Sequence, residues 1–107
     1  MMELNKYQEI AHSTSLHDQP IIYPTLGLTG EAGEVADKVK KVLRDNNSKF
    51  TEPIKEAIAL ELGDVLWYVQ ELAHDLGFTL EEIAQKNIDK VLSRLDRGMI
   101  HGNGDER

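Results

Sequence analysis

The apolar residues of this chain recur at alternating intervals of three and four positions, and this periodicity constrains its fold more than any other feature. Such spacing places apolar side chains along one face of an α-helix, and that face needs a partner to bury it. One apolar row consists of Leu28, Ala32, Val35, Val39 and Val42, and a second consists of Ile58, Leu62, Val65, Val69, Leu72 and Leu76. The sequence therefore predicts an all-α fold in which two long helices pack through these rows.

Residues that begin or end helices divide the chain into four predicted helices. Thr79 and Glu82 have the spacing of a capping box, and Gly77 suits a helix end. The predicted helices cover residues 3–17, 24–45, 51–77 and 79–98. We expect them to form a single domain, residues 1–100, because no linker or repeat interrupts them. The polar tail, residues 101–107, lacks the apolar content to fold alone.

The composition argues against several functions. The 19 acidic residues outnumber the 12 basic ones, and the formal charge of −7 disfavours binding to a nucleic acid backbone. The chain has no cysteine, and its apolar runs fall short of the roughly 20 residues that cross a bilayer. We therefore expect a cytoplasmic protein with no nucleic acid or membrane partner. Four short helices also leave apolar surface uncovered, so we expect self-association as a dimer or a tetramer.

Two pairs of carboxylates lie beside the apolar rows. Glu31 and Glu34 are three positions apart in the second predicted helix, and Glu61 and Asp64 have the same spacing in the third, so each pair shares one helix face. The second pair stands within the apolar run ALELGDVLWYV, where an uncompensated charge is costly. Hard divalent cations meet that need with oxygen ligands, and magnesium does so while also binding substrate phosphates.

If the two long helices pack antiparallel, both carboxylate pairs converge on one cleft. Gly30, Gly33 and Gly63 lie beside the carboxylates. Because glycine within a helix costs about 0.5–1 kcal/mol relative to alanine, these glycines predict close backbone approach or room for a ligand. The simpler interpretation is that the carboxylates form surface ion pairs with Lys38 and Lys41. The repetition of the pair, with glycine beside both copies, favours the metal site.

The segments GEAGEVADKVKK at 30–41 and ELGDVLWYV at 61–69 resemble the ExxE and ExxD signature of MazG-like nucleoside triphosphate pyrophosphohydrolases. The YQ dipeptide at 7–8 and the NxxKxxxR pattern at 87–94 extend the resemblance over most of the chain. The resemblance implies a four-helix, MazG-like bundle completed by homo-oligomerisation. It also implies magnesium-dependent hydrolysis of nucleoside triphosphates to monophosphate and pyrophosphate, with manganese as a possible substitute and clearance of unwanted nucleotides as the cellular role.

The resemblance further assigns roles to single residues. It implies that the magnesium ligands and catalytic residues are Glu31, Glu34, Glu61 and Asp64. It implies that the substrate contacts are Lys38, Tyr68, Asn87, Lys90 and Arg94. The chain departs from the family pattern in two places. Gly30 replaces the first glutamate of many members, as it does in relatives that resemble deoxycytidine triphosphate pyrophosphatases, so position 30 offers no extra base or ligand. Those relatives have a base-contacting aromatic residue where Lys41 stands here, so their base preference is not transferred.

The remaining aromatic residues and histidines carry weaker expectations. Trp67 lies off both polar faces, and we expect it at a subunit contact. The histidines lack the spacing of a zinc motif, so His12, His17, His74 and His101 are expected at the surface or the core boundary. His12, together with Gln8, is a candidate for the base pocket.

Two alternatives stay open on the sequence alone. The first is hydrolysis of dUTP or phosphoribosyl-ATP, since related helical scaffolds with similar acidic clusters carry out both reactions. The second is a non-enzymatic helical interaction module, whose acidic faces bind a basic partner. The second alternative predicts no specific magnesium site.

Overall fold

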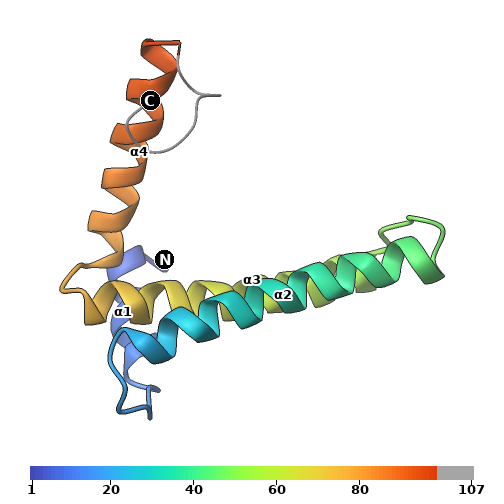
Figure 1. Cartoon of the computed structure of the whole chain (residues 1–107), viewed down its shortest axis with the longest axis horizontal. Coiled ribbons are helices and arrows are strands. Elements are labelled where there is room, and N and C mark those ends of the chain that lie inside the picture. The colour runs from blue at the N-terminus through green and yellow to red at the C-terminus, as the bar shows by residue number, and fades with distance from the viewer. Residues whose placement is uncertain (99–107) are drawn as a thin grey trace.

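A computed structural model of the chain describes residues 1–98, and within that range it contains four α-helices and no β-strand (Figure 1). They are α1 (Leu4–His12), α2 (Ile22–Asp45), α3 (Glu52–Asp75) and α4 (Leu80–Asp96). The predicted all-α fold is therefore confirmed. None of these helices combines the length and the apolar character that crossing a bilayer requires. The predicted tail, residues 101–107, lies outside the described residues.

The helices α2 and α3 pack side by side as an antiparallel pair, as the apolar rows predicted (Figure 1). The loop between them turns at Asn47 and Ser48, whose φ angles of 51° and 61° lie in the left-handed region. Asparagine tolerates this region better than most residues do. Within the apolar rows Val42 is buried and Val65 is half-buried, whereas Leu62 is 55% exposed. The pair alone therefore covers only part of its apolar surface.

The first helix is shorter than the sequence predicted, because it ends at His12 and not near residue 17. The hydroxyls of Ser13 and Thr14 donate to carbonyls three residues earlier, at 2.5 and 2.6 Å. Such local bonds compete with the continuation of a helix. The chain then runs without helix through residues 13–21, which we call the α1–α2 segment.

Side chains of α1 cap the start of α4. Gln8 Oε1 accepts a hydrogen bond from the amide of Leu80 at 2.9 Å, and Asn5 Oδ1 accepts one from the amide of Glu81 at 3.0 Å. The first four amides of a helix have no acceptor within that helix, so α1 supplies partners for two of them. Gln8 is buried and also donates to two backbone carbonyls near the end of α3. This helix thus ties α3 and α4 together.

The junction of α3 and α4 contains the capping elements that the sequence predicted. Gly77 has a φ of 86°, which a residue with a side chain rarely adopts, and it follows the end of α3. Thr79 Oγ1 accepts from the amide of Glu82 at 3.1 Å, and the Glu82 carboxylate accepts from the amide of Thr79 at 3.0 Å. The predicted capping box is therefore confirmed.

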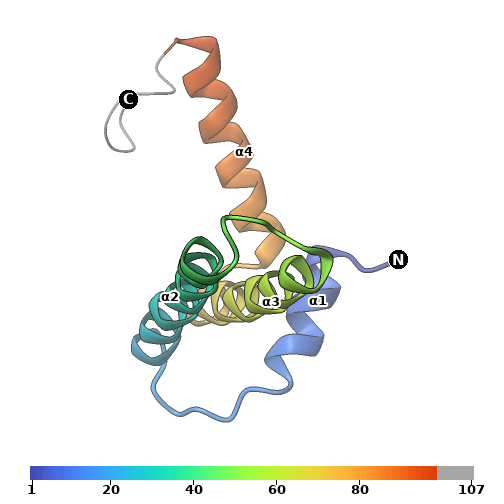
Figure 2. The ribbon, with the colours of Figure 1, turned by 90° about the vertical axis from the view of Figure 1, so that its right-hand side faces the viewer.

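The last helix rises away from the α2–α3 pair (Figures 1 and 2). Within residues 1–98, α4 contacts α1 and α3 but not α2, so the predicted four-helix bundle is not closed by one chain. The radius of gyration is 16.5 Å, whereas a compact chain of about 100 residues has about 13 Å. Leu26, Leu60 and Leu95 are 69%, 68% and 62% exposed. Much apolar surface is therefore exposed in the single chain.

Close approach between α2 and α3 occurs at Gly27. A Cβ atom at this position would lie 2.5 Å from ring atoms Cδ1 and Cζ of Tyr68, well inside van der Waals contact. The glycines beside the carboxylates behave differently, because no described atom would lie within 4 Å of a Cβ at Gly30, Gly33 or Gly63. Of the two alternatives predicted for these three positions, close backbone approach is therefore not found within the chain, and open space is.

Gly27→Ala should destabilise the fold, because its methyl group overlaps the Tyr68 ring. We expect a loss of about 1–3 kcal/mol in the free energy of unfolding, typical of overpacking. Urea denaturation followed by circular dichroism measures it. Gly33→Ala is the matched control on the same helix, and it should stabilise the fold by about 0.5–1 kcal/mol because the space there is open. Equal effects of the two substitutions would contradict the packing described.

Candidate metal centre

Three of the predicted ligand residues, Glu31 of α2 and Glu61 and Asp64 of α3, bring their carboxylates together. One oxygen atom from each side chain lies within 4.8 Å of the corresponding atoms of the other two. The antiparallel packing produces this meeting, because it sets the middle of α2 against the middle of α3. We call these three residues the acidic triad.

The fourth predicted ligand, Glu34, stands apart from the acidic triad. It lies one turn after Glu31 on α2 and is exposed, and its oxygens are not within the triad's group of ligand atoms. Its charge still acts on the triad, because it contributes to the raised pKa of Glu31. Glu34 is therefore adjacent to the triad without belonging to it.

The acidic triad carries more negative charge than its surroundings neutralise. Partial desolvation, followed by the like charges of Asp64, Glu61 and Glu34, raises the pKa of Glu31. Lys38 offsets part of this charge, since its Nζ lies 3.6 Å from Glu61 Oε1. The apolar surroundings expected from the sequence are not found, because Asp64 is exposed and Glu61 is half-buried. Desolvation of Glu31 and the like charges around it therefore act in the same direction, and both disfavour its ionised form.

The donor set of the acidic triad fits a hard divalent cation. Carboxylate oxygens are the ligands that magnesium and calcium prefer, and no thiol or imidazole takes part. A doubly charged cation would offset both the desolvation of Glu31 and the repulsion from its neighbours, which together raise the pKa of Glu31. The exposure of Asp64 leaves room for waters and for a further ligand, which magnesium retains in its sites.

A pocket of about 330 Å³ opens beside the acidic triad and is lined by Glu31, Asp64, Trp67 and Tyr68. Tyr68 lies here as the sequence predicted. Burial, a hydrogen bond with Tyr23 and the nearby carboxylates raise the pKa of Tyr68, so its hydroxyl stays protonated at neutral pH. Trp67 packs edge-on against Tyr68, with ring centroids 5.0 Å apart.

Trp67 is the pocket residue that the sequence analysis missed. It lines the pocket of the acidic triad and a second, adjoining pocket of about 460 Å³, and the subunit contact expected for it stays a prediction. Its position three residues after Asp64 was the available signal, because residues three apart share a helix face. The adjoining pocket is lined by Thr14, Leu16, His17, Asp18, Tyr23 and Trp67.

The predicted phosphate contacts on α4 are not brought to the acidic triad within one chain. Asn87 is exposed, Lys90 is half-buried and Arg94 is buried, all on a helix that has no contact with α2. Lys38 and Tyr68 are the predicted substrate contacts that lie beside the triad. The predicted site residues thus fall into two groups on separate parts of the structure.

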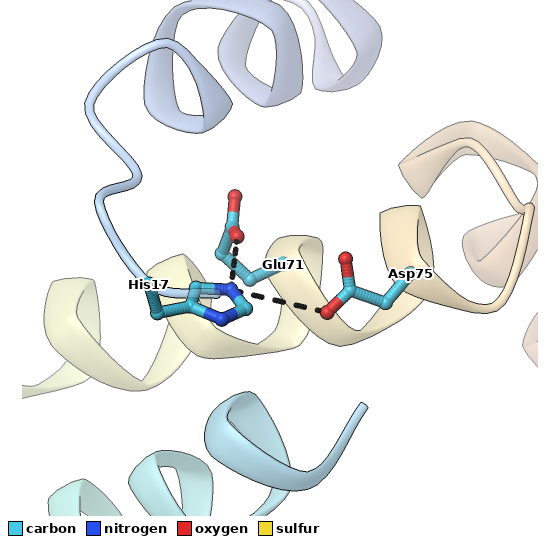
Figure 3. A group of neighbouring side chains, drawn as sticks. All are labelled: His17, Glu71 and Asp75. Atoms are coloured by element: carbon cyan, nitrogen blue, oxygen red, sulfur yellow. Dashed lines mark hydrogen bonds and ion pairs between the residues drawn. The ribbon is translucent and has the colours of Figure 1, made fainter. Parts of the chain in front are cut away.

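A second group of ionisable side chains, His17, Glu71 and Asp75, joins the α1–α2 segment to α3 (Figure 3). His17 Nε2 lies 3.1 Å from Glu71 Oε2 and 3.9 Å from Asp75 Oδ2. His17 Nδ1 accepts a hydrogen bond from the amide of Gln19 at 3.3 Å, so the ring proton resides on Nε2 and points at Glu71. A metal-bound histidine usually donates through its other nitrogen, so these contacts describe a hydrogen-bond network and not a metal site.

His12 and His17 are half-buried and lie at the core boundary, one of the two positions expected for them. His12 Nδ1 is 2.7 Å from Glu71 Oε1, and Gln8 bonds to backbone groups of α3 and α4, so both side chains have partners within the chain. A role of His12 and Gln8 in a base pocket stays a prediction. His74 is exposed, as predicted, and His101 lies outside the described residues.

Asp64→Asn should abolish the response of the fold to magnesium without weakening the fold itself. Removing one charge relieves the repulsion in the triad, so without metal the variant should melt at or above the wild-type temperature. A hundredfold excess of magnesium over its Kd should stabilise the wild type alone, by about 2.7 kcal/mol. Thermal unfolding with magnesium or with chelator measures this. Glu56→Gln, an exposed glutamate of α3, is the control, and a full magnesium response in Asp64→Asn would contradict the assignment.

Comparison with known proteins identifies the family of the chain. The model of the MazG nucleotide pyrophosphohydrolase domain matches residues 23–98, which include the whole acidic triad and α4. The Gene 37 protein of Mycobacterium phage L5 is 42% identical, over 99% of this chain and 100% of that protein. No solved structure matches the chain. The family match and this degree of identity show that the chain belongs to the MazG nucleotide pyrophosphohydrolase family.

Proposed function

We propose that the chain is a magnesium-dependent hydrolase that cleaves nucleoside triphosphates between the α and β phosphates, releasing monophosphate and pyrophosphate. The acidic triad supports this proposal most directly, because its unbalanced negative charge opens into a pocket beside two aromatic rings. A polyphosphate would be repelled by such a site unless a cation stood between them. Clearance of unwanted nucleotides is the cellular role that suits this chemistry.

In this proposal Glu31, Glu61 and Asp64 hold magnesium, and manganese can replace it because it accepts the same ligands. A bound magnesium ion supplies Lewis-acid chemistry, neutralising phosphate charge and lowering the pKa of a coordinated water. Glu34 does not belong to the acidic triad, so it is available for a role other than holding the metal. Because it is exposed and one turn away, we assign it to orienting the attacking water and accepting its proton.

Lys38 has two roles in the proposal. Without substrate, its ammonium group offsets the charge of Glu61 at 3.6 Å. When a cation binds the triad, that contact becomes redundant, and the flexible lysine side chain can turn toward a substrate phosphate. Tyr68, with a protonated hydroxyl, is placed to donate a hydrogen bond in the same pocket.

The nucleoside half of the substrate has a suitable place next to the triad. Trp67 lines both the pocket of the acidic triad and the adjoining pocket, so a molecule held by its phosphates at the triad can extend past the indole ring. The adjoining pocket offers aromatic and polar side chains together. Such a mixture suits a nucleobase, which presents a flat face and hydrogen-bonding edges.

Self-association is part of the proposal, because one chain leaves both its fold and its site incomplete. Asn87, Lys90 and Arg94 would complement phosphate charge, yet α4 has no contact with α2 in the chain. We propose that α4 of a second copy brings them to the acidic triad in a dimer or a tetramer. The exposed apolar residues of α2, α3 and α4 provide the surface for this association.

The reaction is tested by resolving the products formed from each nucleoside triphosphate and deoxynucleoside triphosphate. We expect monophosphate and pyrophosphate with magnesium and no turnover with chelator. Glu61→Gln should lower kcat/KM at least about 100-fold, because it removes a proposed metal ligand. Glu56→Gln should retain the wild-type rate. Diphosphate and phosphate as products, or full activity of Glu61→Gln, would refute the proposal, and the same panel detects a preference for dUTP.

The contribution of a second copy is tested by mixing two impaired variants. Lys90→Ala should raise KM about tenfold by removing a phosphate contact, and Glu61→Gln should be nearly inactive. If α4 acts across subunits, a mixed dimer contains one site in which both residues are intact. Co-expressed variants should then recover about a quarter of the wild-type rate at low substrate concentration. A mixture no more active than the average of its parts would contradict the shared site.

A further inference from the structure

We propose that Glu71 is a positioning residue: through His12 and His17 it fixes the α1–α2 segment as a wall of the pocket that adjoins the acidic triad. Only the effect that we expect on catalysis rests on the proposed function. The docking of the segment itself depends on contacts among residues 12–75 and is measurable without any substrate.

The Glu71 carboxylate is fully buried and bonded on both oxygens. Oε1 lies 2.7 Å from His12 Nδ1 and accepts from Gln70 Nε2 at 3.2 Å, while Oε2 lies 3.1 Å from His17 Nε2. A carboxylate is buried in this way only when its partners are in place. The partners His12 and His17 belong to the end of α1 and to the α1–α2 segment. The charge of Glu71 therefore stabilises the docking of that part of the chain.

Asp75, one turn after Glu71, anchors the far end of the segment. Its Oδ2 accepts a hydrogen bond from the amide of Ile21 at 2.9 Å. Ile21 has a φ of 69°, a conformation that β-branched residues rarely adopt, so tertiary contacts must hold it there. His12, His17 and Ile21 thus attach the start, the middle and the end of the segment to one face of α3.

The attached segment forms one side of the adjoining pocket. Thr14, Leu16, His17 and Asp18 line it opposite Trp67. Thr14 Oγ1 accepts a hydrogen bond from Trp67 Nε1 at 3.0 Å, which joins the segment directly to the residue shared by both pockets. If the segment moves, the wall of the adjoining pocket and the environment of Trp67 therefore change together.

The ionisable groups around Glu71 come from every element packed against it. His12 of α1 and His17 of the segment contact Glu71 directly, and Asp75 of α3 lies 3.9 Å from His17 Nε2. Behind these histidines, the ring of His74 of α3 stacks on His12 and that of Tyr23 of α2 stacks on His17. Burial alone would raise the pKa of Glu71, but hydrogen bonds, including those from His12 and His17, outweigh it and lower the pKa below 4.5. A lowered pKa means that the anion stabilises the docked state above pH 4.5, and this contribution is lost as the pH falls through the lowered value. Docking should persist at neutral pH and fail in acid.

Trp67 is the only tryptophan in the chain, so its fluorescence reports the docking of the segment. Glu71→Gln preserves the shape of the side chain and removes its charge. At pH 7 we expect this variant to show red-shifted emission and about twice the acrylamide quenching of the wild type, as the segment opens locally. Glu56→Gln, an exposed carboxylate of the same helix, should leave both quantities unchanged. Unchanged emission and quenching in a folded Glu71→Gln variant would overturn the proposal.

The wild-type protein supplies a test that needs no variant. On acidification below pH 4.5, Trp67 emission should shift before the helical circular dichroism is lost. Coincident transitions would overturn the proposal, since they would show that Glu71 supports the whole fold and not the segment. Zinc titration provides one more check. A saturable zinc-induced change in emission that His17→Gln removes would also overturn it, in favour of a metal site.

Activity separates this proposal from the proposed function. Loss of a pocket wall should raise the KM of Glu71→Gln about tenfold and leave kcat within about twofold of the wild type. Wild-type protein that hydrolyses no nucleotide but shows the fluorescence changes would leave the docking role standing and remove the proposed reaction. If the wild type hydrolyses nucleotides but Glu71→Gln keeps the wild-type KM and emission, the proposed reaction would stand and the docking role would be removed.

Discussion

The antiparallel packing of α2 against α3 is the constraint on which the rest of the structure depends. It sets Glu31 opposite Glu61 and Asp64, so helices that gain stability from apolar contact also force three like charges together. The pKa of Glu31 is raised as a result, first by desolvation and then by the neighbouring carboxylates. Functional sites often retain unfavourable electrostatics of this kind, because a ligand that relieves them gains affinity from the relief.

Much of the fold was predictable because its signals are local. The apolar rows follow from helical geometry, and Thr79, Glu82 and Gly77 act through bonds to their own neighbours. The end of α1 was mispredicted for a local reason also, since Ser13 and Thr14 bond to the backbone in a way that periodicity does not weigh. Helix ends set by side-chain hydroxyl groups are therefore harder to predict from sequence than helix ends set by glycine.

The candidate site was predictable where one helix face determines it and unpredictable where tertiary contacts do. Glu31, Glu61 and Asp64 meet because two regular helices pack in a simple register. The Glu71 network needs a chain reversal through the α1–α2 segment, and neither the spacing nor the residue types revealed it. The spacing of Glu61, Asp64 and Glu71 places all three on one face of the helix. Glu71 is nevertheless fully buried, while Asp64 is exposed.

The capping of α4 by Asn5 and Gln8 gives the small helix α1 an influence beyond its size. The direction in which α4 leaves α3 depends on two amide side chains that lie more than 70 positions away in sequence. A helix junction held by directional hydrogen bonds has one preferred interhelical angle, whereas a junction held by apolar contact tolerates several angles. Variation at positions 5 and 8 would therefore reorient α4 as a rigid arm, so that relatives with the same acidic triad would differ in the direction in which their last helix points.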